Sequence, residues 1–467
     1  MFGFGFQYGK VLGLSLGALL ASVFRKRVIA DGGIMEGEGC VTSELNRLNK
    51  IGVLDDVSLA MIPSGYKASK LYSVVPSDGS GDLSFSRSTT ATRVNEDGLI
   101  ESVAINTPRI DYKGGGCGSL LLEPQRTNLI TYSEDFSNAY WTKSGSTVVS
   151  GQTSPSADSP TGAFKLVEDT STGSHQTTQT LTGGYSIGDN ITFSCYIKAG
   201  ERSDIIIYSQ QIGKGVNFDL ATGTFGTDAF GNGLPSSYNA EVLENGWYRV
   251  SIGDVVATVV ASSRIYLTEA DDVNSYTGDG TSGVYVFGAQ LELGSYPTSY
   301  IPTAGSTVTR TADSSSTSGL SSVINSEEGV FYAEMSVFSA SGGNMYITLS
   351  DGSDDNEIVI RNTSATNNVV AQYVKNNSNQ ASMDFTLTDR TVLNSIAIRY
   401  KVNDFSLWIN GVKEVEDTSG SVLSANTLNQ LSFSRGNGTS QWSGKVKGLA
   451  IFNTYLTDTQ MAELTTL

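Results

Sequence analysis

Histidine is almost missing from this sequence: the 467-residue chain contains one, His175, beside three cysteines and nine prolines. A Ser, Cys or Thr nucleophile is usually activated by a neighbouring histidine or another base, and catalytic zinc is usually held by histidine or cysteine. His175 stands in the polar stretch STGSHQTTQ, which predicts a solvent-exposed loop or strand. No G-x-S-x-G, P-loop or dinucleotide-binding motif stands out. The sequence therefore predicts a protein that is not an enzyme.

The three cysteines, Cys40, Cys117 and Cys195, lie far apart. Their spacing fits neither a zinc site nor a disulfide framework. We therefore expect three small thiols that are buried or half-buried.

Charged residues are also scarce, at 16%, and acidic ones dominate, so that the formal net charge is −17. The first 30 residues contain basic side chains and no acidic one, which leaves the rest of the chain more acidic than the whole. An acidic body repels a phosphate backbone, so nucleic acid is not an expected partner.

Glycine, by contrast, is abundant (51 residues), and serine, threonine and asparagine are common beside it. Glycine and asparagine adopt positive φ angles at little cost and so favour tight turns. Helical periodicity is almost absent after residue 60, and the length corresponds to about two to four domains. These features predict a mainly β fold, with two antiparallel β-sandwiches after an N-terminal arm that contains a short helix.

The apolar run VLGLSLGALLASVF (11–24) is 14 residues long and is followed by Arg-Lys-Arg. A bilayer span needs about 20 apolar residues, and a signal peptide carries its positive charge before the apolar run. Small residues recur every four positions, which lets another helix or chain pack closely. We interpret the run as a docking arm buried in a partner; a membrane-inserting anchor and a cleaved signal are the alternatives. The docking residues are Val11, Leu12, Leu14, Leu16, Leu19, Leu20 and Phe24.

Two helices and two hairpin turns have local signals. The stretch 42–51 has Thr42 or Ser43 as a cap and Gly52 as a stop, and a second short helix follows Thr457 near the C-terminus. Turns are predicted at 95–98 and at the Asn-Gly pair 410–411, where glycine and asparagine join two alternating runs.

The chain divides into five predicted segments. They are an arm with a short helix (1–75), a β-rich stem (76–126), a first sandwich or jelly roll (127–302), a Ser/Thr-rich linker (303–319) and a second sandwich (320–467). Alternation predicts the inward faces of one strand in each sandwich. These faces are Ile191, Phe193, Cys195 and Ile197 in the first, and Phe331, Ala333, Met335 and Val337 in the second.

Several stretches resemble a known family. The segments RSTTATRVNEDGLIE, LLLEPQRTNLITYSEDFSNAYWTKSGSTV and GAQLELGSYPTSYIPT resemble fibre and spike proteins of tailed bacteriophages, in which such segments bracket a jelly roll similar to carbohydrate-binding modules. ENGWYRVSI resembles an internal strand of that module. FSLWINGVKEV and GKVKGLAIFNTYLTDTQMAEL resemble the laminin-G-like, concanavalin-type lectin sandwich. The resemblance covers about 80–467.

The resemblance implies a structural protein of the virion, on the head or the tail, that projects glycan-binding sandwiches toward the host. It implies other virion proteins (capsid, portal or tail) and a host cell-surface glycan as partners, and a homo-oligomer, with a trimer favoured. A secreted or membrane-anchored bacterial carbohydrate-binding protein is the alternative. A glycan depolymerase could use two carboxylates, but the chain has no visible β-helix repeat.

Sugar binding needs an aromatic face for the C–H side of the ring and polar groups for the hydroxyls. Trp141 and Trp442 stand among loop residues, and Asn437 and Gln441 lie close to the latter in sequence, so these four residues are the candidate glycan site. The other two tryptophans, Trp247 and Trp408, stand within strand patterns and are expected in the core.

Two acidic loops could bind calcium, which prefers six to eight oxygen ligands. The first loop contains Asp351, Asp354, Asp355 and Glu357. The second contains Glu269, Asp271, Asp272 and Asp279. Their spacing departs from that of an EF-hand, and a solvated acidic turn is the alternative. The expected cofactor is therefore none, or calcium with a structural role.

Overall fold

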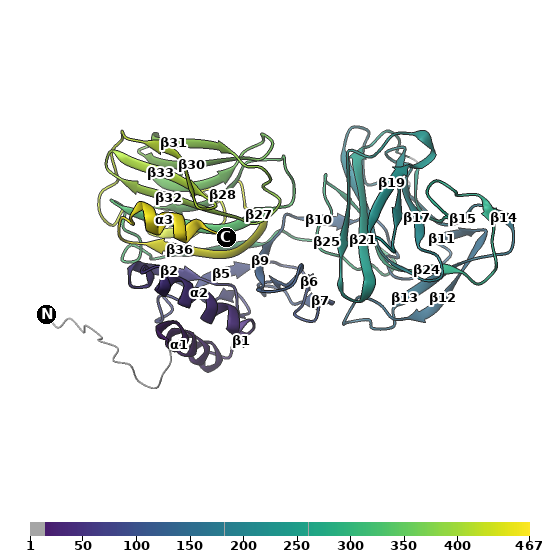
Figure 1. Cartoon of the computed structure of the whole chain (residues 1–467), viewed down its shortest axis with the longest axis horizontal. Coiled ribbons are helices and arrows are strands. Elements are labelled where there is room, and N and C mark those ends of the chain that lie inside the picture. The colour runs from purple at the N-terminus through teal and green to yellow at the C-terminus, as the bar shows by residue number, and fades with distance from the viewer. Residues whose placement is uncertain (1–14, 182, 260) are drawn as a thin grey trace.

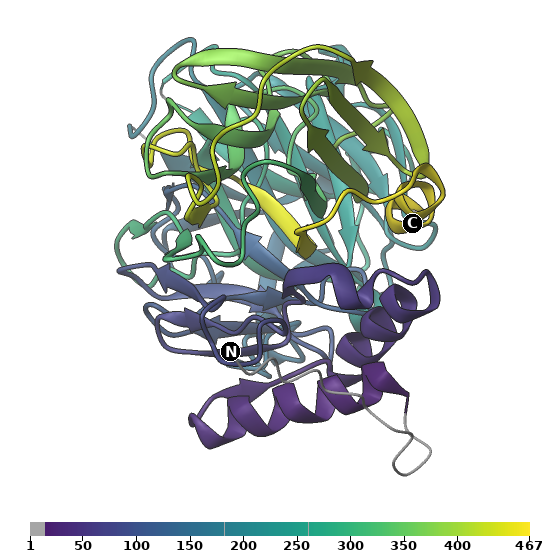
Figure 2. The ribbon, with the colours of Figure 1, turned by 90° about the vertical axis from the view of Figure 1, so that its left-hand side faces the viewer.

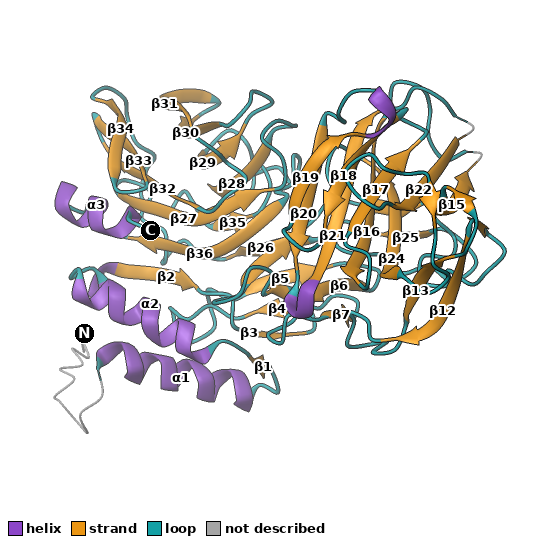
Figure 3. Cartoon of the chain, turned by 45° about the vertical axis from the view of Figure 1, so that its right-hand side comes forward, coloured by secondary structure: helices purple, strands orange, loops and turns teal. Residues whose placement is uncertain are grey.

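The computed structural model of the chain describes residues 15–181, 183–259 and 261–467. Two β-sandwiches lie side by side along its long axis, and the α-helices α1, α2 and α3 all lie against one of them (Figures 1 and 3). Every pairing between the described strands is antiparallel within its sheet. The predicted mainly β fold with antiparallel sandwiches is confirmed.

The sandwich that carries the helices is a composite of two stretches of chain that are far apart in sequence; we call it the composite sandwich. Its larger sheet contains, in spatial order, β1 (Ile34–Met35), β3 (Gly65–Lys67), β4 (Lys70–Leu71), β5 (Leu83–Ser86), β26 (Ser314–Ser318), β35 (Gln430–Ser432), β28 (Met345–Ser350), β29 (Glu357–Asn362), β30 (Asn368–Lys375) and β31 (Ser378–Thr386). Its second sheet contains β34 (Val412–Asp417), β33 (Asp404–Ile409), β32 (Asn394–Lys401), β27 (Gly329–Val337), β36 (Gly444–Phe452), β9 (Ser119–Leu122) and β8 (Ile110–Asp111), and β2 (Val57–Met61) also pairs with β36.

The other sandwich is a single stretch of chain, which we call the inserted sandwich. One sheet contains β11 (Trp141–Ser144), β15 (His175–Leu181), β22 (Ala261–Leu267), β17 (Asp204–Ser209), β18 (Lys214–Asp219) and β19 (Thr224–Asp228). The opposite sheet contains β12 (Ser146–Gln152), β13 (Ala163–Glu168), β24 (Gly283–Leu293), β16 (Asn190–Ala199), β21 (Trp247–Val255) and β20 (Ser237–Val242). Three two-stranded ribbons complete the fold: β6 (Ala91–Val94) with β7 (Ile100–Val103), β10 (Arg126–Asn128) with β25 (Val308–Arg310), and β14 (Thr172–Gly173) with β23 (Tyr276–Thr277).

The five predicted segments therefore need correction. Strand β26, inside the predicted linker 303–319, lies between β5 and β35 in the larger composite sheet. Strands from the predicted arm and stem, including β2 and β9, complete the sheets of the second sandwich. The sequence of β26 is all serine and threonine, so it lacks the apolar alternation that marks a strand; its neighbours supply the core instead. The jelly roll is thus an insertion into one sandwich and does not precede a separate second one.

The predicted core faces are confirmed. Ile191, Phe193 and Ile197 of β16 lie in the core of the inserted sandwich. Phe331 and Met335 of β27 lie in the core of the composite sandwich, where they meet side chains from both of its stretches. The alternate residues of β27 are buried as well, because helices cover the outer face of that sheet.

Three α-helices form that cover: α1 (Leu16–Ala30), α2 (Glu38–Lys50) and α3 (Asp458–Thr465) (Figure 2). Short 3-10 turns occur at Leu54–Asp56, Ala229–Gly231 and Glu244–Gly246. The helix predicted at 42–51 exists but begins earlier, after Gly37, which has a φ of +58°. Thr457 caps α3 through a capping box, as predicted. The turns at 95–98 and 410–411 join β6 to β7 and β33 to β34, also as predicted.

Helix α1 contains part of the predicted docking arm and packs within the chain itself. A Cβ atom on Gly17 would lie 2.5 Å from Asn46 Oδ1 on α2, so the small residue does allow a close helix contact, but with this chain's own helix. Phe24 is buried in the core under the helices, and Leu16 and Leu20 are partly buried against it. Leu19 is half-buried. Val11, Leu12 and Leu14 lie outside the described residues.

Within the described ranges, no helix has both the length and the apolar character that a membrane span requires.

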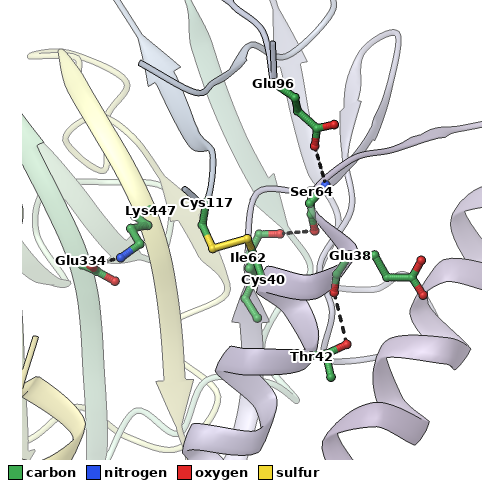
Figure 4. Close-up of a disulfide and its surroundings, with 10 residues drawn as sticks. Glu38, Cys40, Thr42, Ile62, Ser64, Glu96, Cys117, Glu334 and Lys447 are labelled. Atoms are coloured by element: carbon green, nitrogen blue, oxygen red, sulfur yellow. Dashed lines mark hydrogen bonds and ion pairs between the residues drawn. A yellow bond between two sulfur atoms is a disulfide. The ribbon is translucent and has the colours of Figure 1, made fainter. Parts of the chain in front are cut away.

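A disulfide joins Cys40 on α2 to Cys117 in the turn before β9, with the two Cα atoms 5.7 Å apart (Figure 4). The prediction of free thiols was therefore wrong for these two cysteines. They are 77 residues apart in sequence. They come together only in the folded chain, where the glycine-rich turn at 113–118 lies next to α2. Cys195 is a buried thiol, as predicted, and burial raises its pKa.

Candidate functional site

Both tryptophans of the predicted glycan site are buried, with exposed fractions of 1% for Trp141 and 2% for Trp442. Trp141 stacks on Phe136 at 4.6 Å between ring centroids, and its Nε1 donates a hydrogen bond to the carbonyl oxygen of Tyr132 at 2.8 Å. Trp442 belongs to the core of the composite sandwich. Neither ring offers a face to solvent, so the prediction of a tryptophan platform was wrong. The surrounding loop composition does not reveal the direction in which a side chain points.

The two polar partners in that predicted site remain on the surface. Asn437 is exposed, donates to Asp354 at 3.1 Å and accepts from Thr439, so it shapes a turn. Gln441 is exposed as well. With Trp442 turned inward, these two residues have no aromatic partner from the predicted set. Trp247 and Trp408 are buried, as predicted.

The first acidic loop uses its carboxylates for protein contacts. Asp354 and Glu357 form salt bridges with Arg435 at 3.2 and 3.4 Å. Asp351 accepts hydrogen bonds from the backbone and hydroxyl of Ser353. Burial raises the pKa of Glu357. Asp355 is exposed at the tip of the same loop.

The second acidic loop is also self-contained. Asp271 accepts hydrogen bonds from the backbone and hydroxyl of Thr227, and Asp279 accepts them from Thr281 and Ser282. The hydrogen bonds from Ser282 and Thr281 hold the pKa of Asp279 below its usual range. Asp272 weakly accepts from a neighbouring loop. Across residues 15–181, 183–259 and 261–467, no three His, Cys, Asp or Glu side chains come together to hold a metal. A structural calcium ion in these loops therefore stays a prediction.

The single histidine is completely buried, and the prediction of an exposed residue was wrong. His175 begins β15, which is flanked by β11 and β22, and its side chain points inward with those of Thr177 and Gln179. Its ring nitrogens face the carbonyl oxygens of Gly145 and Tyr276. Polar residues therefore occupy inward positions of this strand, which a polarity pattern alone cannot predict.

A buried ionic network lies where the chain crosses between the sandwiches, and we call it the junction network. Glu123 accepts a hydrogen bond from Arg109 at 2.7 Å and pairs with Arg310, while Asp313 pairs with Arg109 and, at 3.1 Å, with Arg87. All five side chains are at most 2% exposed. Burial alone would raise the pKa of Glu123, but Arg310 and Arg109 hold it well below its usual range.

The junction network joins two of the three stretches singled out in the sequence, 120–148 (the first segment) and 288–303 (the second segment). Glu123 ends the first segment's Leu run, and it accepts hydrogen bonds from the backbone and hydroxyl of Ser299 in the second segment at 2.7 and 2.6 Å. Asn128 of the first segment donates to the carbonyl oxygens of Ala289 and Ile301 and accepts from the backbone N–H of Leu291. The two segments therefore lie side by side and connect the inserted sandwich to the composite sandwich.

The hairpin β6–β7 adds an apolar contact to this junction. Ile100 is 3% exposed and packs against Tyr196, Trp247 and Tyr300 on the outer face of the inserted sandwich. Its backbone N–H donates to Pro155 and its carbonyl accepts from Ala157, each at 2.8 Å. We refer to the junction network and this Ile100 contact together as the joint.

We expect Ile100→Ala to loosen the joint and to lower the free energy of unfolding by about 2 to 5 kcal/mol, because it leaves a cavity among large aromatic side chains. Hydrogen exchange should rise in β7 and in the facing strands β16 and β21. Ile105→Ala is the matched control, because Ile105 is 53% exposed and its loss should change little. Equal effects of the two substitutions would contradict the assignment.

A cleft lies beside the joint and is lined by residues from both sandwiches. Lys113 pairs with Glu241 across it, and Lys445 pairs with Asp111 at 2.7 Å. Burial tends to raise the pKa of Glu241, but the charges of Lys113 and Arg249 outweigh burial. The pKa of Glu241 is therefore below its usual value. The carboxylates in this cleft are thus ion-paired, and the cleft is part of the contact between the sandwiches.

Comparison with known proteins gave partial structural similarities only. No protein-family model matches the chain, and no curated protein matches it. Among solved structures, the Ruminococcus gnavus IT-sialidase CBM40 bound to alpha2,3 sialyllactose is 15% identical, with 30% of this chain and 83% of that chain covered and a TM-score of 0.26. The leech intramolecular trans-sialidase is 14% identical, covers 30% and 23%, and has a TM-score of 0.26. The binding domain of botulinum neurotoxin DC in complex with rat synaptotagmin II is 14% identical, covers 33% and 40%, and has a TM-score of 0.28. Several of these neighbours are therefore carbohydrate-binding or receptor-binding domains, but TM-scores this low carry no argument about this chain.

Proposed function

We propose that this chain is a non-catalytic structural protein of a bacteriophage particle, on the head or the tail, that presents its sandwiches to host-surface glycan. The observation that carries the proposal is the joint. Two of the three segments that resemble phage fibre proteins, 120–148 and 288–303, contact each other directly through Glu123 and Ser299. A buried ionic joint suits a protein that must hold a binding domain in a fixed orientation on a particle.

The chemistry of the described residues supports adhesion over catalysis. A glycosidase needs one protonated and one ionised carboxyl group free to reach the sugar. In the cleft, Asp111 and Glu241 are instead paired with lysines. His175 lies inside a sheet, where its ring nitrogens face the backbone carbonyl oxygens of Gly145 and Tyr276. A single shallow sugar site binds weakly, and several copies on one particle raise the effective concentration; a homo-oligomer, with a trimer favoured, would serve this purpose.

Attachment to other virion proteins is proposed for the N-terminal arm. On α1, Val23 and Ile29 have exposed fractions of 39% and 55% although they belong to an apolar helix. They lie close in sequence to the predicted docking residues and offer a partner an apolar surface. The Cys40–Cys117 disulfide fits a protein that works outside a reducing cytosol, which holds equally for a secreted bacterial protein.

Particle composition separates these two settings. We expect mass spectrometry of density-banded particles to detect the full chain. We expect a folded Val23→Asp, Ile29→Asp variant to be missing from particles, because both side chains are exposed on α1 and their replacement leaves the core intact. Detection of the chain only in host membranes or in free medium would contradict the proposal. Fluorescent full-length protein should also bind host cells, and periodate oxidation of the surface sugars should abolish this binding. Incubation of the protein with isolated host glycan should leave the length of the glycan chains unchanged.

A further inference from the structure

The outer face of the sheet β11–β15–β22–β17–β18–β19 gathers polar and aromatic side chains that the joint does not use. Ile205, Ile207 and Ile265 of this sheet fill the core of the inserted sandwich. Side chains alternate along a strand, so the intervening residues point outward. The register places Arg264 of β22 between Thr178 and Tyr208 of its neighbouring strands.

Arg264 is held by neutral groups. Its Nε donates to Ser262 Oγ at 2.8 Å, Nη1 to the Tyr266 hydroxyl at 3.0 Å and Nη2 to Gln210 Oε1 at 3.3 Å. Its guanidinium lies 5.7 Å from the centroid of the Tyr208 ring. Among the residues that the structure describes, no carboxylate forms a salt bridge with it. Many other arginines of this acidic chain are paired with Asp or Glu, so this half-buried cation keeps its charge available.

The hydrogen bonds of Arg264 leave room for a ligand. A guanidinium has five N–H groups, and three are used, which leaves one on each terminal nitrogen. Two parallel N–H groups match the two oxygens of a carboxylate. The contacts to Ser262, Tyr266 and Gln210 fix the guanidinium before a ligand arrives, which reduces the entropy lost on binding.

An aromatic wall stands next to this cation. Phe230 is 38% exposed and lies edge-on to Tyr208 and Tyr266, at 5.3 and 5.4 Å between ring centroids. Its φ is +63°, which is rare for a bulky residue and is typical of strain at functional sites. Its loop is fastened by Asp271, which binds Thr227, so the second acidic loop positions the phenyl ring. An exposed ring of this kind suits the C–H face of a sugar.

An unpaired acceptor completes the surface. Gln176 lies opposite Tyr266 on β15, and its Oε1 is buried without a hydrogen-bond donor. A buried acceptor without a partner is unfavourable, and a sugar hydroxyl could satisfy it.

We propose that this face binds a saccharide that carries a carboxylate, with Arg264 binding the carboxylate, Phe230 stacking on the ring and Gln176 accepting from a hydroxyl. This inference rests on the proposed function and names the class of glycan that the particle recognises. A nucleic acid does not fit, because the body of the chain is acidic.

The test uses the full chain and a panel of immobilised saccharides that contain uronic or sialic acids, each beside its methyl ester, with sulfated saccharides and free inorganic phosphate as further arms. We expect the chain to bind at least one acidic saccharide. Esterification of that saccharide, or the substitution Arg264→Gln, should lower the binding affinity at least about tenfold. Phe230→Ala should also weaken binding. Arg361→Gln is the matched control, because Arg361 also bonds a neutral glutamine, Gln372, but lies on the composite sandwich.

The inference is overturned if no acidic saccharide binds, if esters bind equally, if sulfate or phosphate binds as well as the carboxylate, or if a folded Arg264→Gln variant binds unchanged. Its failure is distinct from that of the proposed function. A chain found in particles that adheres through neutral sugar would refute the role of Arg264 alone. Acidic-sugar binding by a chain absent from particles would refute the virion role alone.

Discussion

Replacing Glu123 with glutamine should lower the free energy of unfolding by about 3 to 5 kcal/mol. Arg109, Arg310 and the Ser299 hydroxyl all donate to one oxygen of Glu123, and the Ser299 backbone donates to the other. In either orientation of the glutamine amide, its NH2 group would replace one carboxylate oxygen and would face a donor that it cannot accept from. The change also leaves the positive charge of the buried arginines without its partner. Removing one partner of a buried ion pair destabilises a protein by more than the intact pair stabilises it. Urea unfolding at pH 7 measures the loss.

Glu201→Gln is the matched control, because Glu201 pairs with Lys165 on the surface and is 55% exposed. We expect a change below about 1 kcal/mol there. The pKa of Glu123 is depressed in the folded state, so its stabilising contribution is present above its unfolded pKa of about 4.3 and is lost as the pH falls through the folded value. The Gln variant should therefore lose less stability than the native chain on acidification. Identical effects of the two substitutions would show that the junction network is not a main source of stability.

Breaking the Cys40–Cys117 disulfide should lower the free energy of unfolding by about 4 kcal/mol, because the bond closes a long loop in the unfolded chain. The two cysteines are 77 residues apart, and the bond ties α2 to the turn before β9. A reducing agent should shift the urea midpoint of the native chain downward. The double variant Cys40→Ser with Cys117→Ser should show the lower midpoint in both conditions.

The control for the disulfide is Cys195→Ala, which leaves the bond intact. That variant should remain sensitive to the reducing agent, because Cys195 is a free, buried thiol. If the native chain unfolds at the same urea concentration with and without reductant, the disulfide does not contribute as proposed.

Local features of the sequence predicted local structure well. The alternation around Phe193 and Phe331 predicted the inward faces of β16 and β27, and Thr457 predicted the start of α3. Each of these signals lies within about ten residues of sequence, where strand period and capping chemistry act directly.

Features that depend on distant partners were not predictable in this way. The Ser/Thr strand β26 is a strand only because β5 and β35 flank it, and Cys40 meets Cys117 only after the sheets form. The direction of Trp442 and of His175 is set by the sheets around them. The candidate site on β22 has no sequence motif, because Arg264 and Phe230 come together through strand register and one turn. An arginine flanked by Ser262 and Tyr266 at two-residue spacing was the one local sign of it.

The rigidity of the joint is the central claim, and a distance between spin labels tests it most directly. Labels on Ala221→Cys in the inserted sandwich and Val402→Cys in the composite sandwich can be placed selectively, because both positions are exposed, Cys195 is buried and the other two cysteines are bonded. We predict a single narrow distance distribution for the native chain and a broad one when Ile100→Ala or Glu123→Gln is added. A broad distribution in the native chain would contradict the account, since the sandwiches would then move independently.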